Sequence, residues 1–395
     1  MTLCSGRLTD EDARRWYEDM NRKRILEQYN LPTKPSSDGY YHVYLKSENG
    51  RRQIKAKTLK RLEDKVIELS KHLLPTFQYA FECSQEEKLK YVKDPEKRAS
   101  MENTIYRTKT NYRRFFHETS FEKMPISEIS KEDVEEVCME NLTKYDLKKK
   151  AFLALRGILK AVFQYAFEQY WILDNVYDRV DFNKYNLMLM RDSDVNKRVH
   201  SDNEIQRMQE YIAETHQKKP EYLPAYALEL QMEMGLRIGE VPPLMWSDIV
   251  NGNIIISKEQ INIRTTRTNQ IVEHTKTWKD RTYPMTSSVR DILNAIREVS
   301  DSEYLFPADT NTGVITNKSI YQYYYRMCKK LNIKLSYDLR KGTHSFRRNA
   351  ITNVVNKSNG NFVMAAQLFG NTPEVARDHY YTGININDAR RVLEG

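Results

Sequence analysis

The stretch "THSFRRNAITNVV" (343–355) has the pattern of a helix start, with Thr343 in the position of an N-cap residue. His344 and Arg347 then fall one helical turn apart on one face. A helix N-terminus also favours an anion, because its first backbone N–H groups have no partner within the helix. The stretch therefore indicates a phosphate clamp, with a surface His–Arg pair as the alternative.

The stretch "EMGLRIGEVPPLMWSDI" (233–249) places Arg237 between apolar residues, with Glu240 three residues later. An arginine at the edge of a core usually needs a partner. One interpretation is a structural ion pair between Arg237 and Glu240. The other is a cation that is held in place for a function.

Four short segments between these stretches alternate in the manner of strands, which predicts a β meander. They are "NIIIS" (253–257), "INIRTTRT" (261–268), "QIVEHT" (270–275) and "RTYPM" (281–285). Lys276 is expected at or beside a hairpin turn, from which its amine projects into a neighbouring site. Lysines in turns are usually only solvated, so this residue indicates little when it is taken alone.

The stretch "AAQLFGNTPEVARDHYY" (365–381) predicts a helix that ends at Gly370. Thr372 is expected to cap a short helix that starts at Pro373 and ends at Tyr380–Tyr381. The chain contains 26 tyrosines, so neither tyrosine is distinguished by its type.

In this order and spacing, the segments resemble the catalytic pattern of the tyrosine recombinase (phage integrase) family, and in particular the integrases of conjugative transposons. That pattern has an arginine in G-x-R-x-x-E, a hairpin lysine, H-x-x-R, a His or Trp after a Leu-Gly type turn, and a tyrosine nine residues later. The resemblance assigns as catalytic the residues Arg237, Lys276, His344, Arg347, Asn371 and Tyr380.

Two positions leave room for another interpretation. Asn371 stands where the family usually has His or Trp, and its amide can still hydrogen-bond a phosphate oxygen. Tyr381 is an alternative nucleophile, but it would break the nine-residue spacing.

The resemblance implies a site-specific recombinase that cleaves and rejoins DNA through a 3′-phosphotyrosyl intermediate, to integrate or excise a mobile element. Arg237 and Arg347 would hold the nonbridging oxygens, Tyr380 would attack, Lys276 would protonate the leaving 5′-oxygen, and His344 would assist proton transfer. No metal or other cofactor is expected. The rivals are a type IB topoisomerase-like enzyme, against which the N-terminal hairpin argues, and a non-catalytic DNA-binding regulator.

The N-terminal part predicts a β-hairpin followed by an amphipathic helix. "YYHVYLK" (40–46) and "RRQIKAK" (51–57) flank an Asn-Gly turn, and 58–69 has helical periodicity. Arg51, Lys55 and Lys57 share one strand face, which could lie in a DNA groove. A solvated charged face is the alternative.

The fold class that follows is multidomain and mainly α-helical, with small β-sheets. We expect an N-terminal helical segment (1–35), an arm-site DNA-binding domain of hairpin and helix (36–75), a linker (76–96) and a helical core-site-binding domain (97–190). A second linker (191–200) would precede an α+β catalytic domain (201–395). In the core-site-binding domain, phosphate contacts are expected from Arg107, Lys109 and Arg113.

Composition agrees with a nucleic-acid partner, because the formal net charge is +9 and 30% of the residues are charged. The four cysteines form no CxxC pair, and no run of 18 apolar residues occurs, so a cytosolic protein, or a nuclear one if eukaryotic, without membrane contact is expected. The resemblance to the integrase family implies a bacterial cytoplasmic, nucleoid-associated protein. The resemblance implies as partners double-stranded DNA with core and arm-type sites, further copies in a homotetramer on DNA, and accessory DNA-bending or excision factors. The C-terminal segment 382–395 would dock on a neighbouring subunit.

Overall fold

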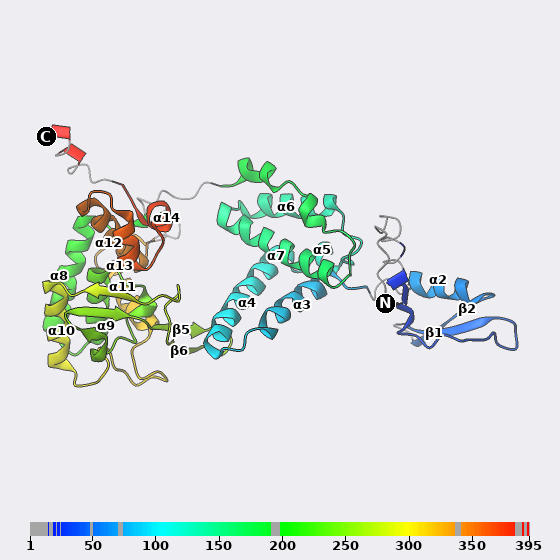
Figure 1. The fold of residues 1–395 in the computed structure, drawn as a ribbon, viewed down its shortest axis with the longest axis horizontal. Helices are drawn as coiled ribbons and strands as arrows, with labels where there is room; N and C mark the ends of the chain where they lie inside the picture. Colours follow the sequence, from blue (N-terminus) through cyan, green and yellow to red (C-terminus); the bar gives the residue numbers. More distant parts are fainter. Residues whose placement is uncertain are drawn as a thin grey trace, which may run out of the picture. The chain divides into compact units, whose positions relative to one another are not determined.

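The computed structural model describes residues 15, 19–20, 22–23, 25–47, 50–69, 74–190, 198–335, 341–383, 389–390 and 393–394. The chain forms two units, Met1–Asp192 and Ser193–Gly395, each with its own internal packing (Figure 1). Most of the C-terminal segment 382–395 and of the linker 191–200 lies outside the described residues, as does much of the helix expected near the N-terminus.

The first unit begins with the hairpin that the Asn-Gly turn predicts. Strands β1 (Tyr41–Ser47) and β2 (Gly50–Ala56) pair antiparallel, and helix α2 (Leu59–Leu69) packs against both. Alternation buries one face of the hairpin, where Val43 and Ile54 meet Leu62 and Val66 of the helix. On the opposite face, the side chains of Tyr44, Gln53 and Lys55 are exposed.

The rest of this unit is a helical domain with a core of its own. It comprises α3 (Phe77–Lys90), α4 (Pro95–Phe116), α5 (Ser120–Lys123), α6 (Lys131–Tyr145), α7 (Lys149–Glu168) and the 3-10 helices η2 (Val176–Arg179) and η3 (Phe182–Met188). The prediction of a linker over 76–96 is wrong. This range contains α3, and Phe77 and Phe81 are buried in the same core as α4, α6 and α7, so 76–96 holds part of the domain.

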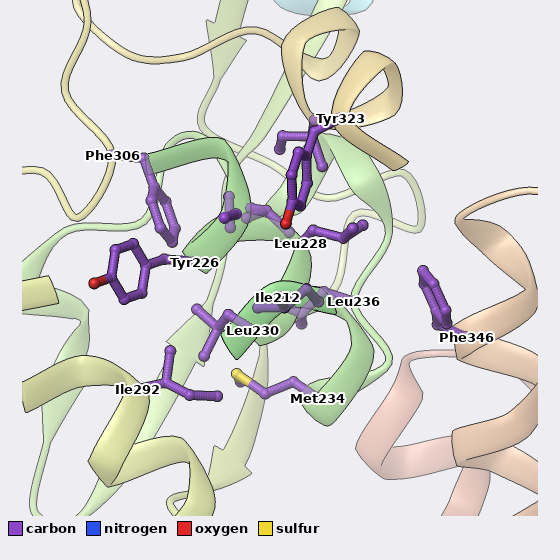
Figure 2. Packing of buried hydrophobic residues seen from close by; sticks show 14 of the residues in the cluster. Ile212, Tyr226, Leu228, Leu230, Met234, Leu236, Ile292, Phe306, Tyr323 and Phe346 are labelled. Carbon is purple, nitrogen blue, oxygen red and sulfur yellow. The ribbon is translucent and has the colours of Figure 1, made fainter. Parts of the chain in front are cut away.

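The second unit is organised around helix α9 (Leu223–Met234), whose side chains are mostly apolar and buried. Its neighbours are α8 (Asp202–Lys218), α10 (Ser287–Val299), α11 (Asn317–Lys330) and α12 (His344–Lys357). Figure 2 shows this packing through the labelled residues Tyr226, Leu228, Leu230, Met234, Leu236, Ile292, Phe306, Tyr323 and Phe346. Burial of this many large apolar side chains is the main source of the unit's stability.

The strands of the second unit do not form the expected meander. Strand β4 (Asn253–Ile256) pairs with β3 (Ile249–Val250) on one side and with β7 (Arg281–Pro284) on the other. Strands β5 (Glu259–Ile263) and β6 (Thr268–Val272) form a separate hairpin. Residues 264–267 form the turn of that hairpin, so the strand predicted for 261–268 ends at Ile263.

After α12, the chain continues through α13 (Phe362–Phe369), α14 (Pro373–Val375) and a π-helical turn, η7 (Ala376–Tyr380). These elements share a small core that includes Ile351, Val355 and Phe369. None of the helices in the described part of the chain has the length and apolarity required to span a membrane.

Candidate active site

The buried carboxylate of Glu240 lies at the centre of the first part of the site and binds two arginines. Arg237 donates from Nη1 to Glu240 Oε1 over 2.8 Å, and its backbone N–H donates to Glu240 Oε2 over 2.8 Å. Arg281 of β7 donates to both oxygens of the same carboxylate, over 2.9 and 2.5 Å. Burial alone would raise the pKa of Glu240, but the charges of Arg281, Arg347 and Arg237 outweigh burial and lower the pKa to about 2.

Two glycines shape the backbone around this carboxylate. Gly235 ends α9 at φ +60°, and a Cβ there would lie 2.7 Å from the Ala350 Cβ and 2.8 Å from Phe369. Gly370 ends α13 at φ +61°, against the Arg281 side chain, as the sequence predicted for the end of that helix. Only glycine fits Gly235 without displacing α12 or α13, so it fixes the approach of the Arg237 segment to these helices.

Arg347 lies completely buried among the ends of two helices. It donates to the carbonyl oxygen of Gly235 over 3.1 Å and to that of Phe369, and these carbonyls belong to the ends of α9 and α13. Burial and the nearby charge of Arg237 lower the pKa of Arg347 to about 9, which leaves the group cationic at neutral pH. Thr343, at the start of the same helix, makes no side-chain cap, contrary to expectation, because it adopts a helical conformation.

Asn371 joins the two arginines. Its Oδ1 accepts from Arg237 Nη2 over 3.1 Å and from Arg347 Nη2 over 3.3 Å. Among the described residues, neither its Nδ2 nor the Nε of Arg347 finds a hydrogen-bond partner, although both atoms are buried. Two unsatisfied donors in one cationic cluster indicate that an acceptor can be bound there.

The tyrosine of the predicted spacing faces the predicted histidine. Tyr380 Oη and His344 Nε2 lie 3.0 Å apart, and the Tyr380 ring also lies over the guanidinium groups of Arg347 and Arg348, at 5.7 and 5.9 Å. Tyr381 points elsewhere, because its hydroxyl donates to Asn356 Oδ1 over 3.1 Å and its ring packs edge-on against Phe362. The geometry therefore favours Tyr380 over Tyr381 as the functional tyrosine.

Desolvation and the surrounding positive charges keep the imidazole of His344 neutral. Desolvation by the surrounding side chains lowers the pKa of His344, and the positive charges of Arg348, Arg347 and Arg237 lower it further. A neutral Nε2 can accept a proton from the Tyr380 hydroxyl.

This electrostatic environment leads to a pH prediction. In an NMR titration of the DNA-free protein, the ring protons of His344 should titrate with a midpoint below the ordinary histidine value of ~6.5. Arg348→Gln should move the midpoint upward, because Arg348 is the positive charge that lowers the pKa of His344 most. A midpoint at or above the ordinary value in the unaltered protein would contradict the prediction.

Lys276 occupies a turn between β6 and β7, which belong to different sheets, so it does not lie on the expected hairpin. The residue is exposed, and its charge acts on His344 and on Glu259 of β5. Its amine makes no hydrogen bond or ion pair within the described part of the chain, so it is held near the cluster only by the turn.

The residues proposed to bind DNA elsewhere are mostly exposed. Lys55 and Lys57 are open to solvent on or just after β2, and the Lys55 ammonium lies 5.2 Å from the centre of the Tyr40 ring. The Arg51 side chain lies outside the described part of the chain. On α4, exposed side chains include Arg107, Lys109 and Arg113, whose DNA contacts stay a prediction.

Sequence reasoning missed Arg281 and the bridging role of Asn371. Arg281 begins a short strand, "RTYP", and has no motif around it. Its part in the site is evident only from the structure, in which Arg281 is buried beside Glu240. The described residues contain no group of three or more His, Cys, Asp or Glu that could hold a metal ion.

Known proteins resemble this chain in sequence over one segment and in fold. Residues 198–371 match the phage integrase family. The fold is similar to the Tn1549 transposon integrase in complex with a circular intermediate DNA, with a TM-score of 0.60, 18% identity, and coverage of 81% of this chain and 99% of that one. It is also similar to a lambda integrase in a tetramer bound to a Holliday junction, with a TM-score of 0.53, 15% identity, and coverage of 90% and 98%. No curated protein matches the sequence significantly.

The fold and the family match together define a DNA strand transferase of the tyrosine recombinase class. The segment 198–371 is similar in sequence to the phage integrase family. This segment contains Arg237, Lys276, His344, Arg347 and Asn371, whereas Tyr380 lies nine residues beyond its end.

Proposed function

We propose that this recombinase cleaves and rejoins double-stranded DNA through a 3′-phosphotyrosyl bond to Tyr380, to integrate or excise a mobile element. The observation that carries the proposal is the 3.0 Å contact between Tyr380 Oη and His344 Nε2, beside the Arg237–Asn371–Arg347 cluster. A nucleophile beside a neutral base and next to positioned cations is what in-line transfer at a phosphodiester requires.

In the proposed cleavage step, the Tyr380 oxygen bonds to phosphorus while the P–O5′ bond breaks. The phenol proton goes to His344, and Lys276 gives a proton to the leaving 5′-oxygen. Arg237, Arg347 and the Asn371 amide would stabilise the charge on the nonbridging oxygens. The unsatisfied Nε of Arg347 and Nδ2 of Asn371 are buried, so we expect the Tyr380 ring to move when a phosphate reaches them.

The chain would act on core and arm-type sites as a homotetramer, with accessory DNA-bending or excision factors, in the bacterial cytoplasm at the nucleoid. Support comes from the solved relatives, which are bound to circular intermediate DNA and, as a tetramer, to a Holliday junction. The exposed basic residues of the hairpin and of α4 fit contacts to the DNA backbone. The family match favours recombination over a topoisomerase-like activity or a non-catalytic regulator.

A nicked suicide duplex that carries the cognate core site tests the proposal. The protein should form a DNA adduct that survives SDS, and the adduct should form in EDTA. Arg237→Lys should still bind DNA but cleave roughly 10²–10³ times more slowly, because a lysine cannot copy the forked guanidinium contact. Complete absence of an adduct with the unaltered protein would contradict the function.

Asn371 variants test the proposed phosphate contact. Asn371→Asp keeps the oxygen that bridges the arginines, but it replaces the amide donor with a charge that repels phosphate. We expect cleavage to fall by about 10²-fold. Asn371→His restores an N–H donor of the kind usual in the family and should lose less. The measurement is the rate of single-turnover adduct formation. Equal rates for Asn371→Asp and the unaltered protein would contradict the proposed contact between Asn371 and the phosphate.

A further inference from the structure

The turn that carries Lys276 is held at its base. The Trp278 backbone N–H donates to the Thr275 carbonyl oxygen over 2.9 Å, which makes 275–278 a β-turn with Lys276 at its first central position. The Thr275 hydroxyl donates to the Lys279 carbonyl over 2.9 Å, and Thr275 is completely buried. Lys276 therefore projects from the exposed tip of a turn whose base is fixed.

Trp278 occupies an unusual position in this turn. Its φ of +55° lies in the left-handed region, which disfavours a bulky side chain and usually takes glycine. The indole stacks on the imidazole of His274, with ring centroids 3.5 Å apart and an interplanar angle of 15°. His274 itself is buried, and its Nδ1 lies 3.0 Å from the Thr275 carbonyl oxygen. The stack thus holds a strained residue in place at the last position of the turn.

From this arrangement we propose that Trp278 and His274 are positioning residues for the acid step, because their stack sets the turn that presents Lys276. The inference rests on the proposed function, in which Lys276 protonates the leaving oxygen. Backbone strain that is maintained by a specific contact is concentrated at functional sites. The turn also needs such support, since no hydrogen bond or ion pair to the described residues fixes the Lys276 side chain, which acts on His344 only through its charge.

A change of the leaving group in the DNA substrate can distinguish a role of Trp278 and His274 in presenting Lys276 from a general structural role. With an ordinary phosphodiester, breaking the P–O5′ bond requires a proton at the 5′-oxygen. With sulfur in place of that bridging oxygen, the P–S bond breaks to release a thiolate. A thiol ionises near pH ~8.5, so this thiolate needs no proton from Lys276. A defect in presenting Lys276 should therefore disappear on the sulfur substrate, whereas a defect in DNA binding or folding should remain.

The experiment measures single-turnover adduct formation by the full chain on matched suicide duplexes with a 5′-bridging oxygen or sulfur. We expect Trp278→Ala to slow cleavage of the oxygen substrate by about 10- to 100-fold, as expected for a misplaced catalytic group. On the sulfur substrate, its rate should return close to that of the unaltered protein, as should the rate of Lys276→Ala. Trp278→Phe, which keeps a ring to stack on His274, should retain most of the activity on both substrates.

Two controls separate the possible failures. Tyr170→Ala removes another exposed aromatic residue at positive φ, from the helical domain, and should leave both rates unchanged. Arg237→Lys should stay slow on both substrates. Suppose that the sulfur substrate restores cleavage by Lys276→Ala. The positioning role of Trp278 is then overturned if Trp278→Ala is equally slow on both substrates. It is also overturned if Trp278→Ala is not slowed on the oxygen substrate. If Lys276→Ala is not rescued, the assignment of Lys276 as the acid fails and the inference fails with it.

Discussion

Replacing Tyr380 by phenylalanine should abolish the covalent protein–DNA adduct on the nicked suicide duplex while leaving noncovalent DNA binding intact. The substitution removes the only atom that would bond to phosphorus, and it keeps the ring that lies over Arg347 and Arg348. No other described group takes the place of that oxygen 3.0 Å from His344 Nε2. The measurement is SDS-resistant adduct on a gel, beside a mobility shift under native conditions.

Tyr381→Phe is the matched control, since it removes the same atom from the adjacent residue. The Tyr381 hydroxyl donates to Asn356, so its loss costs one hydrogen bond, about 1 kcal/mol of stability, and should leave adduct formation unchanged. An adduct that persists in Tyr380→Phe and vanishes in Tyr381→Phe would show that the nine-residue spacing assigns the wrong tyrosine.

The parts of the site that were predictable from sequence are those in which local spacing alone brings two groups together. His344 and Arg347 share a helical face, and Arg237 lies three residues before the carboxylate that it binds. The hairpin of the first unit was predictable for the same reason, because its Asn-Gly turn and alternation are local signals. The contact between His344 and Tyr380 was indicated only by the resemblance to a family.

The unpredicted parts depend on contacts between distant segments. Arg281 reaches Glu240 across 41 residues, and Asn371 accepts from Arg237 across 134. Neither contact is marked by a periodic pattern or a short spacing between its two partners in the sequence. The position of Lys276 was wrong in detail because β7 pairs with β4, so the lysine lies in a turn between separate sheets. Strand pairing of this kind is decided by side-chain packing, which a single sequence does not reveal.

Glu240→Gln should destabilise the second unit more than any substitution proposed above. The glutamine keeps one oxygen acceptor but removes the charge that neutralises Arg237 and Arg281, which are 12% and 4% exposed in their side chains. Removing one partner of a buried ion pair leaves an uncompensated charge and costs roughly 3–5 kcal/mol. Hydrogen exchange of α9 and β7 amides in the full chain measures this cost within the second unit.

The matched control is Glu298→Gln, which removes an exposed carboxylate from α10 of the same unit and should change stability by less than about 0.5 kcal/mol. The double variant Glu240→Gln/Arg281→Gln should lose less stability than the sum of the two single variants, because it removes both charges of the tightest pair. Additive losses of stability would show that the contributions of Arg281 and Glu240 to the free energy of unfolding are independent.

The same carboxylate predicts how stability changes with acidity. The pKa of Glu240 is lowered from its ordinary value of 4.5 to about 2, so its ion pairs stabilise the fold fully above pH ~4.5 and progressively less as the pH falls towards 2. Each pKa unit corresponds to ~1.4 kcal/mol, so about 3 kcal/mol depends on this group. Glu240→Gln lacks the titrating carboxyl, and its stability should therefore fall less steeply over this range. Parallel acid unfolding curves for the two proteins would show that Arg237, Arg281 and Arg347 do not hold this carboxylate in its charged form.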